Sequence, residues 1–143
     1  MISRRRALQT TLGALAVVMA GRTPDADAQS APAGRVTRTE IFRQALPNAR
    51  GKEVIVVSIE YAPGAGSTKH RHPGPVFAYV ARGAVVSQLG TEPPVTYGEG
   101  EMWYEALGAI HSISRNASET EPAKLIAFFV ADQKQVLTEP ISN

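Results

Sequence analysis

The 143-residue sequence contains no cysteine. A disulfide framework is therefore excluded, which fits an exported protein that needs none, although cytosolic proteins can lack cysteine too. Aspartate is also scarce: Asp132 is the only one after residue 28, and no general acid–base pair is evident. The chain has almost no 3.6-residue periodicity, no heptad and no internal repeat, which excludes a coiled coil or a repeat array.

The first 28 residues have the pattern of a cleaved signal peptide. A charged start precedes an apolar run over residues 11–20, which is short for a bilayer span, and Ala26-Asp27-Ala28 has the A-x-A cleavage form. Ser3-Arg4-Arg5-Arg6-Ala7-Leu8 is similar to a twin-arginine export signal. An ordinary secretory signal and an uncleaved anchor are the alternatives. We expect a periplasmic or secreted protein, with no membrane contact after cleavage.

Removing this segment changes the charge balance. It holds four of the 15 Lys and Arg and two of the 13 Asp and Glu, so eleven of each sign remain. The basic isoelectric point belongs largely to the targeting segment, and the mature chain is formally neutral. We therefore expect no nucleic-acid partner.

Short β-branched or apolar segments separated by glycine and proline predict strands. Residues 36–46 allow a strand or a helical turn, and Arg82-Gly83 is expected to be a two-residue hairpin turn. The pattern predicts one all-β barrel or sandwich. We divide the chain into a disordered tether (29–35), a barrel (36–135) and a C-terminal tail (136–143), with further strands expected over 53–61, 76–81, 84–89, 96–97, 101–105, 109–114 and 124–131.

Two of the three histidines lie one residue apart, as His70 and His72. On an extended strand such side chains point to one face, roughly 6.5 Å apart, so both imidazoles can reach one ion. His111 lies on a later predicted strand with Ala109 and Ile113 on the same face. The plainer alternatives are exposed loop histidines and an ordinary polar residue at a strand end.

Two segments carry a family resemblance. The first runs from Gly64 through His70 and His72 to Gly83, and the second from Gly100 through Gly108 to His111. Their spacing resembles the two motifs of the cupin family over roughly residues 52–131. The resemblance implies a single-domain, jelly-roll-like β-barrel with His70, His72 and His111 as ligands of a divalent transition metal (Fe, Mn, Ni or Zn).

The sequence departs from the motifs at three positions. Val76 and Phe77 stand where the first motif has an acid. In the second motif, Ala106 replaces the proline, and Arg115 takes the asparagine position with Asn116 one residue late. The usual three-His, one-Glu set is thus reduced to three histidines, an arrangement that some cupin dioxygenases use with iron.

Gln88 is a candidate for the fourth ligand or a substrate contact, because it would lie across the predicted hairpin from Phe77. Strict alternation favours Ser87 instead, and a β-bulge would exchange the two. Glu105 is expected to be a rim residue without a metal role. Tyr61, Tyr79 and Trp103 are candidates for the pocket wall, although aromatic residues more often fill the core.

Two functions follow from these observations. The first is an exported metal-dependent enzyme, for which a dioxygenase-type oxidoreductase acting on a small molecule is the favoured class. The second is a non-catalytic binding protein whose metal is structural or absent. A homodimer is expected by analogy with small cupin barrels.

Overall fold

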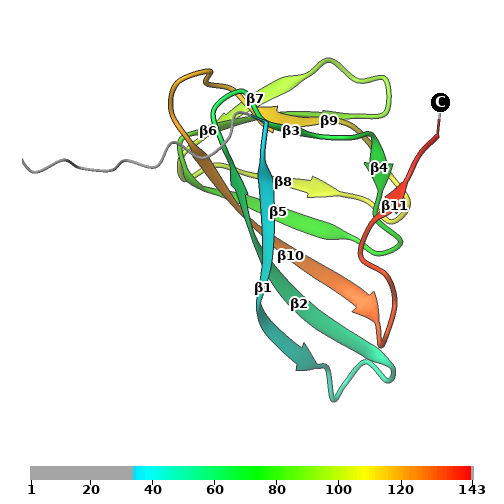
Figure 1. The fold of residues 1–143 in the computed structure, drawn as a ribbon. Helices are drawn as coiled ribbons and strands as arrows, with labels where there is room; N and C mark the ends of the chain where they lie inside the picture. Colours follow the sequence, from blue (N-terminus) through cyan, green and yellow to red (C-terminus); the bar gives the residue numbers. More distant parts are fainter. Residues whose placement is uncertain (1–33, 143) are drawn as a thin grey trace, which may run out of the picture.

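The protein folds into two antiparallel sheets that face each other (Figure 1). The structure is a computed structural model that describes residues 34–142. The predicted signal peptide and almost all of the predicted tether lie outside the described residues. In those residues no helix is long and apolar enough to cross a membrane. The all-β prediction is confirmed.

One sheet has five strands and the other six. The five-stranded sheet has the order β1 (Val36–Ala45), β2 (Lys52–Tyr61), β10 (Ala123–Asp132), β5 (Val76–Arg82), β8 (Met102–Glu105). The six-stranded sheet has the order β11 (Glu139–Pro140), β4 (His70–Arg71), β9 (Ile110–Asn116), β6 (Ala84–Leu89), β7 (Val95–Gly98), with β3 (Gly66–Ser67) paired to β9.

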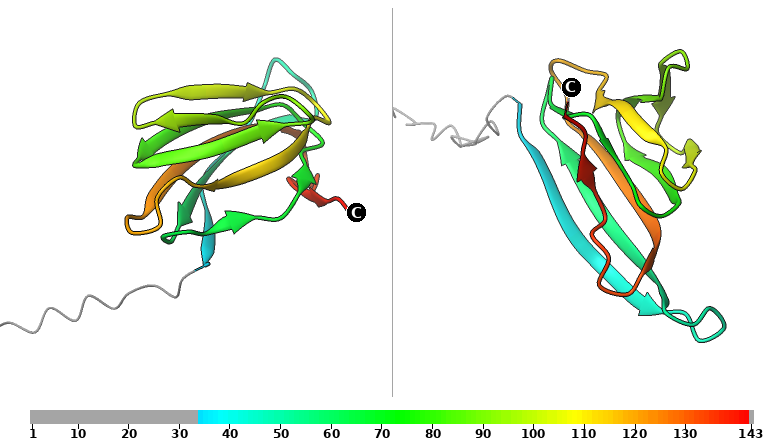
Figure 2. Two further views of the ribbon diagram at one scale, coloured as in Figure 1. Left: turned by 90° about the horizontal axis from the view of Figure 1, so that it is seen from above. Right: turned by 90° about the vertical axis from the view of Figure 1, so that its right-hand side faces the viewer.

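The core lies between the sheets, as the layered view in Figure 2 shows. Alternation along β2 and β10 turns Val57, Ile59, Leu125 and Ala127 inward, where they are buried. On the outer face of the five-stranded sheet, an apolar row runs across all of its strands, from Phe42 through Val56, Phe128 and Phe77 to Tyr104. Residues 36–45, for which a helical turn was the alternative, form a strand.

The predicted hairpin at Arg82-Gly83 is wrong. β5 pairs with β10 and β8, whereas β6 pairs with β9 and β7, so the chain crosses from one sheet to the other at this point. Gly83 has a φ of 70°, and a Cβ there would lie 3.0 Å from the carbonyl oxygen of Pro122. The glycine is needed for the crossing, but the same residue type also fits a hairpin turn.

A β-bulge in β9 changes which residues face inward. His111 pairs with Leu89 and Ile113 with Gln88, so Ser112 is the extra residue. The prediction that Ile113 shares a face with His111 is therefore wrong, because Ser114 and Asn116 take the inner positions and are buried. The bulge also explains why Asn116 comes one residue later than the motif asparagine.

The segment expected to be a loose C-terminal tail contains β11, which pairs with β4. Figure 1 and Figure 2 show this red segment returning along the side of the molecule where β4 lies. The Ile141 N–H donates to the Lys69 carbonyl. The sequence did not indicate this pairing, because a strand of two residues is too short to show an alternating pattern.

We predict that Asn116→Ala lowers the free energy of unfolding by about 2–4 kcal/mol. The Asn116 side chain is 1% exposed. Its amide donates to the carbonyls of Ala62 and Glu121 at 3.1 and 2.8 Å and accepts from the Ser118 N–H, so the variant leaves buried polar groups unsatisfied. Urea unfolding measures the loss. The exposed Asn48→Ala is the control and should change stability by less than about 0.5 kcal/mol; equal effects would contradict the prediction.

Candidate metal centre

The three histidines come together on the inner face of the six-stranded sheet. His70 on β4 lies directly opposite His111 on β9, and His72 follows just beyond the end of β4. The ring centroids of His70 and His72 are 4.8 Å apart, and those of His70 and His111 are 5.1 Å apart. All three side chains are buried, and one nitrogen from each lies within 4.8 Å of the others. Such a group could hold a metal ion.

Backbone carbonyls orient two of the imidazoles. Nδ1 of His70 lies 2.6 Å from the Thr68 carbonyl oxygen, and Nδ1 of His72 lies 2.6 Å from that of Leu137. Because a carbonyl oxygen only accepts, each Nδ1 carries the proton and donates. In the neutral ring Nε2 then presents its lone pair, and such an outer hydrogen bond is usual for metal-binding histidines.

His111 is held by side chains. Its Nε2 lies 2.9 Å from the Ser87 hydroxyl, and its Nδ1 lies 3.3 Å from Oε1 of Glu105. The nitrogen of His111 that faces the carboxylate is therefore Nδ1.

Glu105 reaches this group from the opposite sheet. It lies on β8 directly across from Val76 of β5 and is 2% exposed. The Trp103 indole N–H donates to its Oε1 at 2.9 Å. Its Oε2 lies 3.6 Å from Nε2 of His72 and has no hydrogen-bond partner among the described residues. A buried carboxylate oxygen thus faces an imidazole lone pair, and two acceptors in this position need a cation or a proton between them.

Burial and the contacts between these side chains shift the pKa values of the site. It lowers the pKa of His70 and His72 despite the carbonyl hydrogen bonds. Burial alone would raise the pKa of Glu105, but the hydrogen bond from His111 and the nearby imidazoles outweigh it and lower that pKa. Burial also raises the pKa of Tyr61, so its phenol stays protonated near neutral pH.

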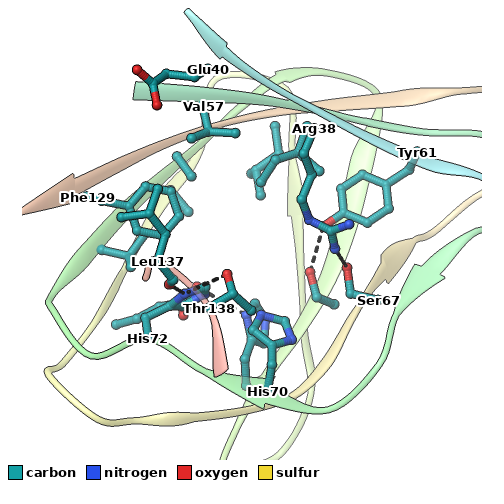
Figure 3. A pocket seen from close by; sticks show the side chains of 18 residues that line it. Arg38, Glu40, Val57, Tyr61, Ser67, His70, His72, Phe129, Leu137 and Thr138 are labelled. Carbon is teal, nitrogen blue, oxygen red and sulfur yellow. Dashed lines mark hydrogen bonds and ion pairs between the residues drawn. The ribbon is translucent and has the colours of Figure 1, made fainter. Parts of the chain in front are cut away.

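The site forms one wall of a cavity of about 240 Å³ between the two sheets. Figure 3 shows His70 and His72 at one side, with Phe129, Val57 and Leu137 around an apolar part of the wall. Arg38, Tyr61 and Ser67 lie together on another part. The cavity can take a small molecule in contact with the imidazoles.

Three of the predicted site residues lie elsewhere. Gln88 is not in the cavity wall; its side chain donates to the Glu92 carbonyl at 2.7 Å. Alternation along β6 turns Ser87 inward instead, because the bulge falls in β9. Tyr79 is on the outer face and 37% exposed. Trp103 is buried but does not line the cavity; it stacks on Tyr97, with the two ring centroids 4.6 Å apart. Tyr61 does line it.

Two features of the site were not predicted from the sequence. Glu105 is a buried residue of the site and not a rim residue. Strand alternation could have indicated this, because it places Glu105 on the same face of the four-residue strand as the apolar Trp103. Leu137 and Thr138 also line the cavity, and no pattern marked them.

Comparison with known proteins agrees with this fold. Residues 57–129 match the cupin domain family. No curated protein matches the chain. A cupin-like protein from Thermotoga maritima is similar in structure, with a TM-score of 0.60 and 21% identity over 77% of this chain and 78% of that one.

Two enzymes share the fold. The DMSP lyase DddQ from Ruegeria pomeroyi matches with a TM-score of 0.60 and 19% identity over 76% of this chain and 54% of the lyase. Oxalate oxidase, in complex with the substrate analogue glycolate, matches with a TM-score of 0.53 and 22% identity over 71% of this chain and 53% of the oxidase. The chain spans about half the length of each.

The paired histidines, the two facing sheets and the family match therefore lead to one assignment: the chain belongs to the cupin family.

Proposed function

We propose that the protein is a metal-dependent enzyme that oxidises a small molecule in the cavity. It would bind one divalent transition metal (Fe, Mn, Ni or Zn) through His70, His72, His111 and Glu105. The observation that carries the proposal is the unpartnered Oε2 of Glu105, which lies 3.6 Å from the lone-pair nitrogen of His72. A cation bound by both groups would remove this repulsion.

The donor set fits such an ion. Three imidazoles and one carboxylate suit first-row transition metals, and they leave coordination positions free for other ligands. The nitrogens lie within 4.8 Å of one another, which is close enough for one ion to be bound by all three. Two of the imidazoles are oriented by carbonyls of Thr68 and Leu137.

The other residues of the cavity would prepare the substrate. Bound Fe(II) would supply O₂ activation and polarisation of a chelating substrate. The aliphatic and aromatic wall around Phe129 excludes water. The Tyr61 hydroxyl lies 2.7 Å from that of Ser114, and its protonated phenol can donate a hydrogen bond to a substrate oxygen. The fold also accommodates lyases, so the reaction class needs its own test.

Metal content is the first test. Purified protein should contain about one equivalent of transition metal by plasma mass spectrometry, and a chelator should lower its melting temperature. The His70→Ala/His72→Ala double variant should lose the metal and show no response to the chelator. Tyr61→Phe is the control, because it changes the cavity but no proposed ligand. Metal-free wild-type protein with no response to added metal would contradict the proposal.

Glu105→Gln separates a ligand role from a structural one. We predict at least a tenfold loss of metal affinity in competition titrations. The metal-free variant should lose about 1–3 kcal/mol of stability at most, because the amide keeps an acceptor for Trp103 but loses the charge that faces His111. The exposed Glu99→Gln is the control and should change neither property. Unchanged metal affinity would reject Glu105 as a ligand, and a loss of stability with unchanged affinity would leave it a structural role.

Oxygen uptake tests the reaction class. Metal-loaded protein should consume O₂ with at least one member of a panel of diketones, thiols and phenolics, and the double histidine variant should consume none. Uptake equal in both proteins, or none with a metal-loaded site, would reject oxidation. The second outcome would favour the non-catalytic binding function.

A further inference from the structure

A second polar group lies in the same cavity, away from the histidines. Arg38 on β1 faces inward opposite Ile59 and lines the cavity. In Figure 3 its guanidinium group lies beside Tyr61 and Ser67. Within the part of the chain that the structure describes, its side chain donates one hydrogen bond, to the Ser67 hydroxyl at 2.6 Å. A guanidinium group has five N–H donors, so most of them are free for a ligand.

Among the described residues, Arg38 forms no ion pair. The other acid in the cavity wall outside the histidine site is Glu40, and it is already paired. Arg43 binds Glu40 at 2.7 Å and also contacts Glu53. A bulge after Glu40 brings Arg43 to this position. Arg43 thus pairs with both neighbouring carboxylates, and neither of them forms an ion pair with Arg38.

We propose that Arg38, together with Ser67, binds the carboxylate of the substrate, which is therefore a small monocarboxylic acid with a compact apolar body. This inference rests on the proposed function for its substrate role. Arginine matches a carboxylate with two parallel hydrogen bonds. The apolar body would lie against Phe129, Val57 and Leu137.

The charge of the loaded site supports an anion. A divalent ion with the Glu105 carboxylate leaves one positive charge, and Arg38 adds another. A neutral ligand would leave both charges without a counter-ion, although Arg38 is exposed and so also in contact with water. A monocarboxylate removes one of them at the Arg38 end, and its other end stays free to approach the imidazoles.

Calorimetry with matched acid and amide pairs tests the proposal. The probes are phenylacetate with phenylacetamide, isobutyrate with isobutyramide, and 3-phenylpropanoate with 3-phenylpropanamide. We expect the wild type to bind at least one acid roughly ten- to hundredfold tighter than its amide. Arg38→Met should abolish this preference, Arg38→Lys should keep part of it, and Arg82→Met, outside the cavity, should keep all of it.

The titrations are repeated on metal-free protein, and the metal content of every sample is measured. A preference that persists without metal and disappears in Arg38→Met supports the anchor even if the proposed metal enzyme fails. A preference that Arg38→Met retains, but that disappears with the metal, would mean that the acid binds at the metal and would overturn the proposal. Failure of every acid to bind at millimolar concentration, in protein with its metal, would also overturn it.

Discussion

A buried carboxylate among apolar side chains must be compensated, and the contacts around Glu105 answer that requirement. Its Oε1 receives the Trp103 N–H and faces His111, while Oε2 faces His72 and has no partner among the described residues. An unpaired buried charge costs several kcal/mol. The short strand β8 carries both Trp103 and Glu105 inward, so the same four residues supply the charge and part of its compensation.

The pairing of β5 with β8 explains how a site can lack the motif acid and still contain a carboxylate. Of the two residues at the expected acid position, Val76 is the one that faces inward; it is 2% exposed, and its cross-strand partner is Glu105. Paired residues on one face have Cβ atoms only about 4.5–5.5 Å apart. An acid moved across one strand pair therefore reaches nearly the same place, and an apolar residue at position 76 fills the space that it leaves.

The sequence alone was sufficient to predict those features that depend on residues close together in the chain. The strands, the barrel class and the histidine pair follow from alternation and spacing, and the structure places His70, His72 and His111 together. Glu105 was predicted at the rim and Gln88 in the site, and both predictions failed because these positions depend on pairing between strands that are distant in the sequence. The bulge at Ser112 and the sheet change at Gly83 decide that pairing, and neither has an unambiguous pattern. Leu137 enters the site only because β11 returns to β4.

The distribution of arginines gives the cavity two unlike ends. The bulge between Glu40 and Phe42 shifts the alternation of β1, so Arg38, Glu40 and Arg43 all lie on the side of the cavity. Arg43 forms ion pairs with both nearby acids, and such pairs are satisfied without any ligand. Among residues 34–142, the side chain of Arg38 has only the neutral hydroxyl of Ser67 as a partner. A fold selected for stability alone would gain from an acid near Arg38. Because the described residues place no such acid there, a ligand can neutralise the charge of Arg38. A metal can neutralise the Glu105 carboxylate on another part of the cavity wall.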